Sequence, residues 1–190
     1  MTTEILFRAA KKSDVAHLSR MLAYASEGLA PYYWQTIADD GQDPWEMGRT
    51  RCLRKESSCS YTNTTVAEIN GKYAGSLSTY LIDDVPEPID LETMPSIFIP
   101  IQELEDLAPS TQYVSVLAMY PDYRGHGIGS TFLAQAEKAA AGRTMSLVVS
   151  DGNPGAHSLY KRSGYREHAS RKMIKEHWNG EGENWILMLK

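Results

Sequence analysis

The sequence predicts a mixed α/β fold, with a central and mostly antiparallel sheet of about seven strands flanked by about four helices. Three observations predict it. The 190 residues suffice for one domain with its own core. Segments with strand and helix periodicity alternate along the chain. A strand–helix–strand unit over 112–150 requires parallel pairing with a right-handed crossover, whereas the flanking hairpins require antiparallel pairing, so the sheet must be mixed.

The first 60 residues predict one strand and two helices. Residues 4–10 are typical of a short strand, and apolar residues between 15 and 22 fall on one face of the helix that follows. Residues 28–44 are turn-rich and aromatic. Asp43-Pro44 then predicts the start of a second helix, which runs to about Glu56, because Asp is a good cap and Pro suits the first helical position.

A hairpin and a long excursion come next. Residues 62–69 and 73–82 predict two strands joined at Asn70-Gly71, because both turn residues tolerate positive φ. Residues 83–110 are acidic and rich in proline, with one helical turn expected near 101–107. A connection of this length inside a compact domain is usually functional or mobile.

The last third alternates strands and helices. Residues 112–119 predict a strand, 121–129 a glycine-rich turn and 128–141 a helix with one apolar side. The nearly all-apolar segment 145–149 is typical of a buried central strand. A second short helix is expected over 154–163. The final two strands are expected over 166–174 and 184–189.

Composition excludes several classes of protein. Hydrophobic residues make up 42% and charged residues 23%, which is ordinary for a globular chain, and no apolar run approaches the length of a membrane span. The N-terminus does not resemble a secretory signal. Cys52 and Cys59 lie seven residues apart without a zinc-ligand pattern, so we expect reduced, buried or half-buried thiols, no metal and a cytoplasmic location.

Charge is distributed unevenly along the chain. Residues 1–123 hold nine Lys or Arg against eighteen Asp or Glu, whereas residues 124–190 hold ten against six. This asymmetry argues against a nucleic-acid partner. It favours a small phosphorylated ligand near the C-terminal third and a cationic or neutral co-substrate on the acidic side. Ordinary solvated surface is the alternative interpretation.

The glycine-rich turn over 124–130 (RGHGIGS) predicts a phosphate site. Glycine lets the main chain approach a ligand, and the first amides of the following helix point outward without internal acceptors. A Walker A loop is excluded because no lysine precedes Ser130. A dinucleotide fingerprint would use Gly125, Gly127 and Ser130, with Asp151 on the ribose. Four residues separate the strand from the motif, and few residues follow it, so this alternative fits less well.

A third interpretation rests on a resemblance to a family. Arg124-x-x-Gly127-x-Gly129 after a strand resembles the acetyl-coenzyme A pyrophosphate loop of the GNAT superfamily of N-acetyltransferases. A second block, from Asn153 to Tyr165 (NPGAHSLYKRSGY), resembles the strand–helix segment that follows in that superfamily. The two blocks together cover 112–170. Residues 1–190 are then expected to form a single GNAT-like domain, with acceptor-side helices and the acidic excursion in 1–110 and the acetyl-CoA core and C-terminal hairpin in 111–190.

The resemblance implies roles for particular residues. Main-chain groups of Leu117, Ala118 and Met119 would pair with the pantetheine arm, and Asn153 would hydrogen-bond it. Tyr160 would lie beside the thioester sulfur and protonate the leaving thiolate. The residues implied to hold the pyrophosphate are Arg124, Gly125, His126, Gly127, Ile128, Gly129 and Ser130.

The general base and the acceptor site are less defined. Many members of the superfamily carry a glutamate on the strand before the loop, where this chain has Tyr113 and Ser115. The open alternatives are Glu27, Glu103 or Glu105, or a water chain. Aromatic residues could line an acceptor pocket or pack the early helices against the sheet. The aromatic residues expected in that pocket are Tyr32, Tyr33 and Trp34, with Trp45 beside them.

The function predicted is transfer of an acetyl group from acetyl-CoA to the primary amine of an unidentified small molecule or peptide. Transfer of a longer acyl group and a CoA-binding regulatory domain without turnover are the alternatives. No membrane partner is expected, and a homodimer through the final strands is plausible.

Overall fold

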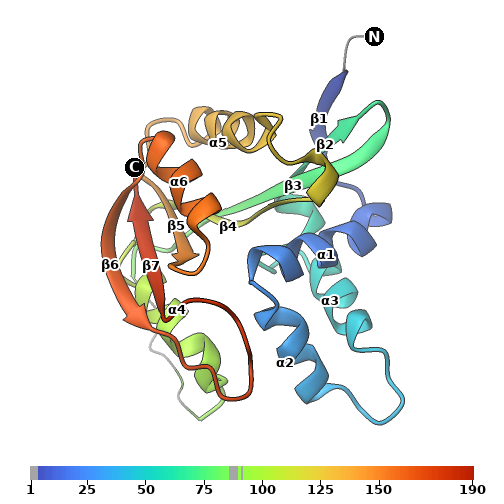
Figure 1. Ribbon diagram of the computed structural model, residues 1–190, viewed down its shortest axis with the longest axis vertical. Coiled ribbons are helices and arrows are strands. Elements are labelled where there is room, and N and C mark those ends of the chain that lie inside the picture. The colour runs from blue at the N-terminus through green and yellow to red at the C-terminus, as the bar shows by residue number, and fades with distance from the viewer. Residues whose placement is uncertain (1–3, 86–89, 91) are drawn as a thin grey trace. The chain divides into compact units, whose positions relative to one another are not determined.

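The computed structural model describes residues 4–85, 90 and 92–190. Within these ranges the chain forms seven strands and six α-helices (Figure 1). The strands are β1 (Ile5–Ala9), β2 (Thr64–Ile69), β3 (Lys72–Leu81), β4 (Gln112–Met119), β5 (Met145–Ser150), β6 (Arg166–Lys172) and β7 (Asn184–Leu189). The helices are α1 (Val15–Ala25), α2 (Leu29–Ile37), α3 (Pro44–Leu53), α4 (Ile99–Glu105), α5 (Ile128–Ala139) and α6 (Pro154–Arg162).

The strands form a mixed sheet in the order β1-β2-β3-β4-β5-β7-β6. The β4–β5 pair is parallel, and its register joins Gln112–Val114 to Met145–Leu147. The β1–β2, β2–β3, β5–β7 and β6–β7 pairs are antiparallel. The predicted mixed sheet, with parallel pairing across the strand–helix–strand unit, is therefore confirmed.

The hairpin between β2 and β3 turns where the sequence predicts. Asn70 and Gly71 both have positive φ, 49° and 74°. Two consecutive residues with positive φ make the tight turn whose twist matches the flanking strands.

Residues 28–44 differ from the prediction, because they contain α2 rather than turns alone. Gly28 adopts a left-handed conformation with φ of 83°, which lets the chain leave α1 and enter α2 at once. Pro31 is the third residue of α2, where its missing N–H would have no helical acceptor anyway.

The helical segment expected near 101–107 is also longer and begins earlier, since a 3₁₀ turn at Ser96–Phe98 leads into α4. These two helices bring the number in the described chain above the predicted four; residues 86–89 and 91 of the excursion lie outside the described residues.

The chain divides into two compact units, each made of two stretches of sequence. Unit 1 comprises Met1–Thr79 and Ser115–Phe132, and unit 2 comprises Tyr80–Val114 and Leu133–Lys190. Because β3 and β4 each begin in one unit and end in the other, neither unit is a continuous half of the sequence. The organisation as a single domain stays a prediction.

The core of unit 1 forms where α1 and α3 pack beside the strands. Its buried members are Leu18, Met21, Cys52, Cys59, Val66, Val116 and Ala118. The two cysteines are free and buried, as the sequence predicts, and their sulfur atoms lie 3.7 Å apart. The hydrogen bond to Cys59 and burial raise the pKa of Cys52, while the same hydrogen bond lowers the pKa of Cys59.

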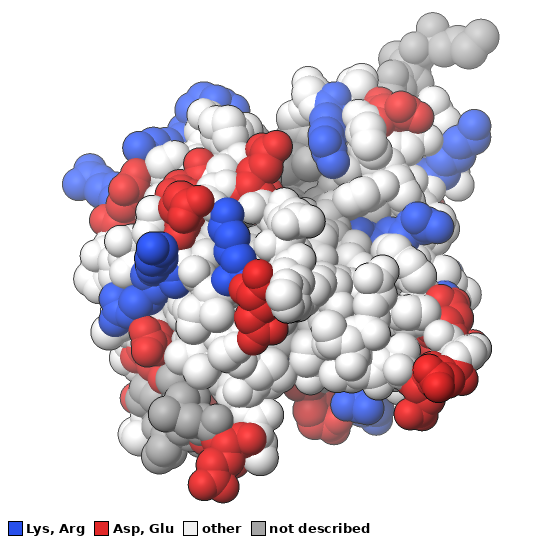
Figure 2. Space-filling model, turned by 60° about the horizontal axis from the view of Figure 1, so that its bottom comes forward, with Lys and Arg blue, Asp and Glu red and all other residues white. Residues whose placement is uncertain are grey.

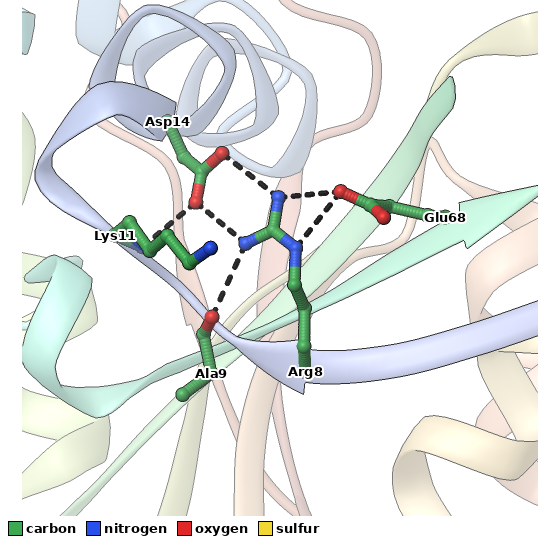
Figure 3. A network of polar contacts seen from close by, with 5 residues as sticks. All are labelled: Arg8, Ala9, Lys11, Asp14 and Glu68. Carbon is green, nitrogen blue, oxygen red and sulfur yellow. Dashed lines mark hydrogen bonds and ion pairs between the residues drawn. The ribbon is translucent and has the colours of Figure 1, made fainter. Parts of the chain in front are cut away.

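An ionic network ties the first strand of unit 1 to the helix that follows it (Figure 3). The guanidinium of Arg8, on β1, contacts Asp14 at 2.8 Å and Glu68, on β2, at 2.6 Å. The main-chain amide of Lys11 donates to Asp14 at 2.7 Å. Burial alone would raise the pKa of Asp14, but the hydrogen bonds from Arg8 and Lys11 and the charge of Arg8 lower it overall.

Unit 2 packs α4 against β5, β6 and β7. Trp178 and Trp185 stack with ring centroids 5.9 Å apart, next to the start of β7. Pro100, the second residue of α4, and Leu104 are buried in this layer. The unit therefore has its own apolar core, on which the two final strands lie.

The surface carries charges of both signs. On the face drawn in Figure 2, acidic and basic side chains are interspersed rather than gathered into one field. None of the helices in the described part of the chain combines the length and the apolar character that a membrane span requires. The same residues contain no cluster of three or more His, Cys, Asp or Glu side chains placed to hold a metal ion.

Candidate functional site

The glycine-rich loop of unit 1 follows β4 through a 3₁₀ turn at Pro121–Tyr123 and ends at α5. Gly125 and Gly127 have φ of 79° and 76°, a region that other residues rarely adopt. A Cβ atom placed on either glycine would meet no atom within 4 Å, so open space adjoins both positions. Residues 124–127 are exposed. The loop therefore presents bare main chain to the surroundings.

The start of α5 leaves amide groups without helical acceptors. The first bond of the helical pattern runs from the amide of Thr131 to the carbonyl of Gly127, at 3.1 Å. Ile128, Gly129 and Ser130 precede this bond, so the helix offers their amides no partner. With the helix dipole, these groups favour an anion such as a phosphate.

The two charged or titratable side chains of the loop are only loosely engaged. Arg124 donates from Nε to the carbonyl of Met119 at 3.4 Å, and its guanidinium lies 5.8 Å from the ring centre of Tyr24. The Nδ1 atom of His126 lies 2.9 Å from the carbonyl oxygen of Arg124. Both side chains are exposed, so each can rearrange toward an anion at the loop.

The end of β4 precedes the loop in unit 1. Leu117, Ala118 and Met119 lie beyond the short register that pairs β4 with β5. Next to them, β3 approaches closely, because a Cβ on Gly75 would come within 2.5 Å of the Ala118 carbonyl oxygen. The side of residues 117–119 that faces β3 is therefore closed by the contact with Gly75.

Unit 2 holds the second predicted block. Asn153 caps α6, since its side-chain oxygen accepts from the amide of Ala156 at 2.9 Å. Tyr160, on α6, is 7% exposed, and its ring contacts that of Tyr165 with centroids 5.9 Å apart. The amide group of Asn153 and the hydroxyl of Tyr160 are therefore carried by one short helix.

A carboxylate surrounded by phenols lies in the same unit. The hydroxyl of Tyr80, on β3, donates to Glu105, on α4, at 2.8 Å. The ring of Tyr113, on β4, lies beside that of Tyr80, with centroids 5.3 Å apart. Burial raises the pKa of Glu105 in spite of the two phenols, which lower it. We call Glu105, Tyr80, Tyr113 and Tyr160 the phenol–carboxylate cluster.

Tyr160 is counted with this cluster because its charge acts on the pKa of Tyr113. Burial raises the pKa of Tyr113 well above its ordinary value, with further contributions from Glu105, Tyr80 and Tyr160. Two of the sequence-predicted residues, Glu105 and Tyr160, therefore both influence the pKa of Tyr113. Glu103 is different, because its carboxylate contacts Arg171 of β6 at 2.7 Å and is partly exposed.

The other predicted residues lie in or next to the helices of unit 1. Glu27 lies between α1 and α2, has a positive φ of 55° and is half-buried. Trp34 is 3% exposed and fills the space beside Gly48 of α3, while its ring contacts Trp45 at 5.4 Å. Trp34 therefore follows the alternative in which the aromatic residues pack the early helices. Tyr32 and Tyr33 are half-buried on the same helix.

The dinucleotide-binding alternative would need the Asp151 carboxylate to be available for a ribose. Asp151 accepts from the amides of Glu183 and Asn184 at 2.7 and 3.1 Å, and from the Asn184 side chain at 2.9 Å. Burial raises the pKa of Asp151, but these bonds lower it overall. The carboxylate thus holds the turn before β7 rather than standing ready for a ribose.

Sequence reasoning did not assign Tyr80 or Tyr113 to a site. One signal for Tyr113 was present, since side chains alternate along a strand and residues 113, 115 and 117 of β4 share a face. Tyr80 carries no such signal, because its contact with Glu105 joins positions 25 residues apart.

Comparisons with solved structures extend over nearly the whole chain. An N-acetyltransferase from Staphylococcus aureus Mu50 shares 15% identity and a TM-score of 0.65, with 97% of this chain and all of that chain covered. A ribosomal-protein-alanine N-acetyltransferase from Brucella melitensis shares 22% identity and a TM-score of 0.56, covering 97% and 98%. Naa50 of Arabidopsis thaliana, in complex with the bisubstrate analogue CoA-Ac-MVNAL, shares 14% and a TM-score of 0.57, covering 98% and 97%. At these identities the likeness concerns the fold.

Sequence comparison identifies the family. None of the curated proteins compared with this chain matches it. Residues 25–165 match the Acetyltransferase (GNAT) family, and this range includes the loop, the cap of α6 and the phenol–carboxylate cluster. Because the match spans most of the sequence, the chain belongs to the GNAT family of acetyltransferases and is a transferase.

Proposed function

We propose that this protein transfers an acetyl group from acetyl-CoA to a primary amine. One observation carries the proposal: the exposed glycine loop at the start of α5 offers positive-φ main chain with open space beside it. The family match supports the reaction class. The loop fits a diphosphate, because unpartnered amides and a helix N-terminus both favour a negative group.

Binding of the co-substrate would use residues of both predicted blocks. The amides from Gly125 to Ser130 would hold the diphosphate, with Arg124 adding charge. The amide group of Asn153 is the donor proposed for the pantetheine arm, because its oxygen already caps α6. Main-chain groups of Leu117, Ala118 and Met119 would pair with the arm as the resemblance implies.

The reaction joins nitrogen to carbon and releases a thiol. The lone pair of a neutral amine attacks the thioester carbonyl carbon, and an amide of the β4 end would stabilise the oxyanion. The C–N bond forms, the C–S bond breaks, and the amine nitrogen loses one proton. Tyr160 is the proposed acid that gives a proton to the departing thiolate. Holding amine and thioester in contact supplies much of the remaining rate.

The acceptor class is a peptide amino terminus or a small cationic amine. The acidic balance of residues 1–123 supports a cationic acceptor. One similar structure is a ribosomal-protein-alanine N-acetyltransferase and another holds the bisubstrate analogue CoA-Ac-MVNAL, and both names support a peptide or protein acceptor. Half-buried Tyr32 and Tyr33 are the aromatic residues proposed to line the acceptor side, whereas Trp34 packs the helices.

The test is an acceptor screen that detects free thiol. Acetyl-CoA is incubated with the protein and with an alanine-initiated peptide, the peptide MVNAL, a lysine-bearing peptide or spermidine. We expect thiol release and an acetylated product with at least one amine. In Tyr160→Phe we expect kcat to fall about a hundredfold or more, because general acids contribute on that scale.

Tyr165→Phe is the matched control. Tyr165 is a buried phenol that contacts the Tyr160 ring, and its hydroxyl has no hydrogen-bond partner among the described residues. Its removal should leave kcat unchanged. Binding of CoA without turnover of any amine, with wild type and Tyr160→Phe alike, would instead support the CoA-binding regulatory alternative. A preference for a longer thioester would support the longer-acyl alternative. The cytoplasmic location and the homodimer stay predictions.

A further inference from the structure

The C-terminal end of α1 lies against the start of the glycine loop in unit 1. Tyr24, in the last turn of α1, has its ring centre 5.8 Å from the guanidinium of Arg124. The same ring meets that of Tyr120 edge to face, with centroids 6.1 Å apart and planes at 85°. Tyr120 and Arg124 flank the 3₁₀ turn that leads from β4 into the loop. One exposed tyrosine of α1 thus contacts both ends of this turn.

Tyr120 is itself fixed by two elements. Its hydroxyl oxygen lies 2.7 Å from Nδ1 of His17, and its main-chain amide donates to the carbonyl of Ala74 at 2.9 Å. The ring of His17 stacks on that of Tyr73, on β3, with centroids 4.3 Å apart. Residues seven apart lie on nearly the same face of a helix, so His17 and Tyr24 both face this region from α1. The aromatic support at the start of the loop is therefore fixed by α1 and β3 together.

The contact with Tyr24 leaves Arg124 able to bind an anion. An aromatic ring takes the face of a guanidinium, whereas the five N–H groups point outward in its plane. In the described part of the chain, Arg124 uses Nε to donate to the carbonyl of Met119, at 3.4 Å. The two terminal nitrogens remain as donors for a phosphate.

A long, exposed side chain loses rotamer freedom when it binds a ligand. Arginine has one of the largest side-chain entropies, and ordering it opposes binding. The contacts with the Tyr24 ring and the Met119 carbonyl restrict Arg124 before a ligand arrives. Part of the entropy is then lost on folding rather than on binding. The contact with Tyr24 should therefore increase affinity for a diphosphate and leave the acetyl-transfer step unchanged.

We propose that Tyr24 is a positioning residue that holds Arg124 at the diphosphate site of the glycine loop, with His17 and Tyr120 supporting it. This proposal rests on the proposed function, since it needs the loop to bind CoA. It gives a role in co-substrate binding to α1, a helix of the segment that the sequence assigns to the acceptor side.

Calorimetry with CoA and the full chain measures the effect. Tyr24→Leu should raise the Kd for CoA about twofold to fivefold, which is the size of an exposed cation–π contact. Tyr24→Phe keeps the ring and should bind CoA like wild type. In the thiol-release assay with the best acceptor of the amine panel, Tyr24→Leu should raise KM for acetyl-CoA by a similar factor and leave kcat unchanged.

A double-mutant cycle tests whether the effect passes through Arg124. Arg124→Gln alone should raise the Kd for CoA about tenfold, because a charge-assisted hydrogen bond is lost. Adding Tyr24→Leu to Arg124→Gln should then change the Kd no further. Tyr61→Leu is the matched control, since the Tyr61 ring centre lies 6.0 Å from Nζ of Lys12 in a cation–π pair that includes no loop residue. This control should leave the Kd for CoA unchanged.

A second measurement needs no ligand. The Nε–H signal of Arg124 can be followed by NMR in ¹⁵N-labelled protein, with Arg124→Gln to assign it. The ring current of Tyr24 should displace this signal from the position of a free arginine. The displacement should persist in Tyr24→Phe and disappear in Tyr24→Leu.

The outcomes separate the two proposals. Wild-type affinity in Tyr24→Leu, or the same loss of affinity with and without Arg124, overturns the positioning role while CoA binding by the loop stands. An equal loss in Tyr24→Phe and Tyr24→Leu overturns it too, because the hydroxyl would then carry the effect. Failure of the wild-type protein to bind CoA contradicts the proposed function and overturns the role of Tyr24 with it. Absence of thiol release with every amine contradicts acetyl transfer alone, since CoA affinity tests Tyr24 independently.

Discussion

The glycine loop and the phenol–carboxylate cluster differ in their exposure to solvent and in the chemical groups that they offer. The loop, in unit 1, is exposed and uses main-chain amides, with Gly125 and Gly127 at positive φ. The cluster, in unit 2, uses side chains, of which Tyr113 and Tyr160 are only 5% and 7% exposed and Tyr80 and Glu105 are half-buried. An exposed amide binds an anion without a change of protonation. An enclosed phenol or carboxylate has its pKa moved, which is what proton transfer requires.

This difference predicts which kinetic quantity each region governs. Substitutions in the loop should weaken binding of CoA and leave the chemical step intact. Substitutions in the cluster should lower kcat and change its pH dependence, with little effect on CoA affinity. A loop variant that alters the pH profile of kcat, or a cluster variant that alters only CoA affinity, would contradict this division between binding and chemistry.

The largest effect expected in the loop comes from Gly127→Ala. An Ala at φ of 76° strains the main chain by about 1–2 kcal/mol, and its methyl group enters the open space proposed for the diphosphate. We expect the Kd for CoA to rise about tenfold to a hundredfold, while kcat at saturating acetyl-CoA stays near wild type. Isothermal titration calorimetry with CoA measures the first quantity and thiol release the second.

Gly71→Ala is the control for backbone strain. Gly71 has φ of 74°, belongs to the same unit and also has no atom within 4 Å of an added Cβ. It should lose similar stability without losing CoA affinity. Equal losses of affinity in the two variants would show that strain, and not the diphosphate site, explains the effect in Gly127→Ala.

A smaller effect is expected in the ionic network that belongs to neither region. Asp14→Asn removes the charge that Arg8 and the Lys11 amide hold (Figure 3). We expect the free energy of unfolding at pH 7 to fall by about 1–2 kcal/mol, a value reduced by the partial exposure of Arg8. Urea denaturation measures it, and CoA affinity and kcat should not change.

The pH dependence of this loss has a definite sign. The folded-state pKa of Asp14 is lowered, so its contribution is present above the unfolded pKa of about 3.9 and disappears as pH falls through the folded value. The difference between wild type and Asp14→Asn should therefore be constant near neutral pH and shrink below about pH 4. A difference that grows toward acid would contradict the network as described.

The strands were the most predictable part of the fold. Residues 112–119 and 184–189 have the predicted bounds, because apolar and β-branched residues alternate between clear turn signals. The helix α2 was missed, since Pro31 and three consecutive aromatic residues resemble a turn in isolation. Its helical conformation depends on burying Leu29, Ala30 and Trp34, which is a tertiary effect that local pattern does not contain.

The candidate site was predictable where it is made of main chain. The loop can be read from consecutive residues, because glycine spacing reports backbone conformation directly. The cluster cannot, because Tyr80, Glu105 and Tyr113 come from three elements and meet only in the folded unit. Glu105 was therefore one of several open alternatives for the base, and its phenolic partners were not assigned.

Amide NMR tests most directly whether the loop binds the diphosphate of CoA. CoA is titrated into ¹⁵N-labelled protein while the amides of Gly125, Gly127 and Gly129 are followed, with NAD as the comparison ligand. These amides should show the largest shifts with CoA and stay still with NAD. Saturable CoA binding that leaves all three unmoved, or movement with NAD alone, would contradict the account.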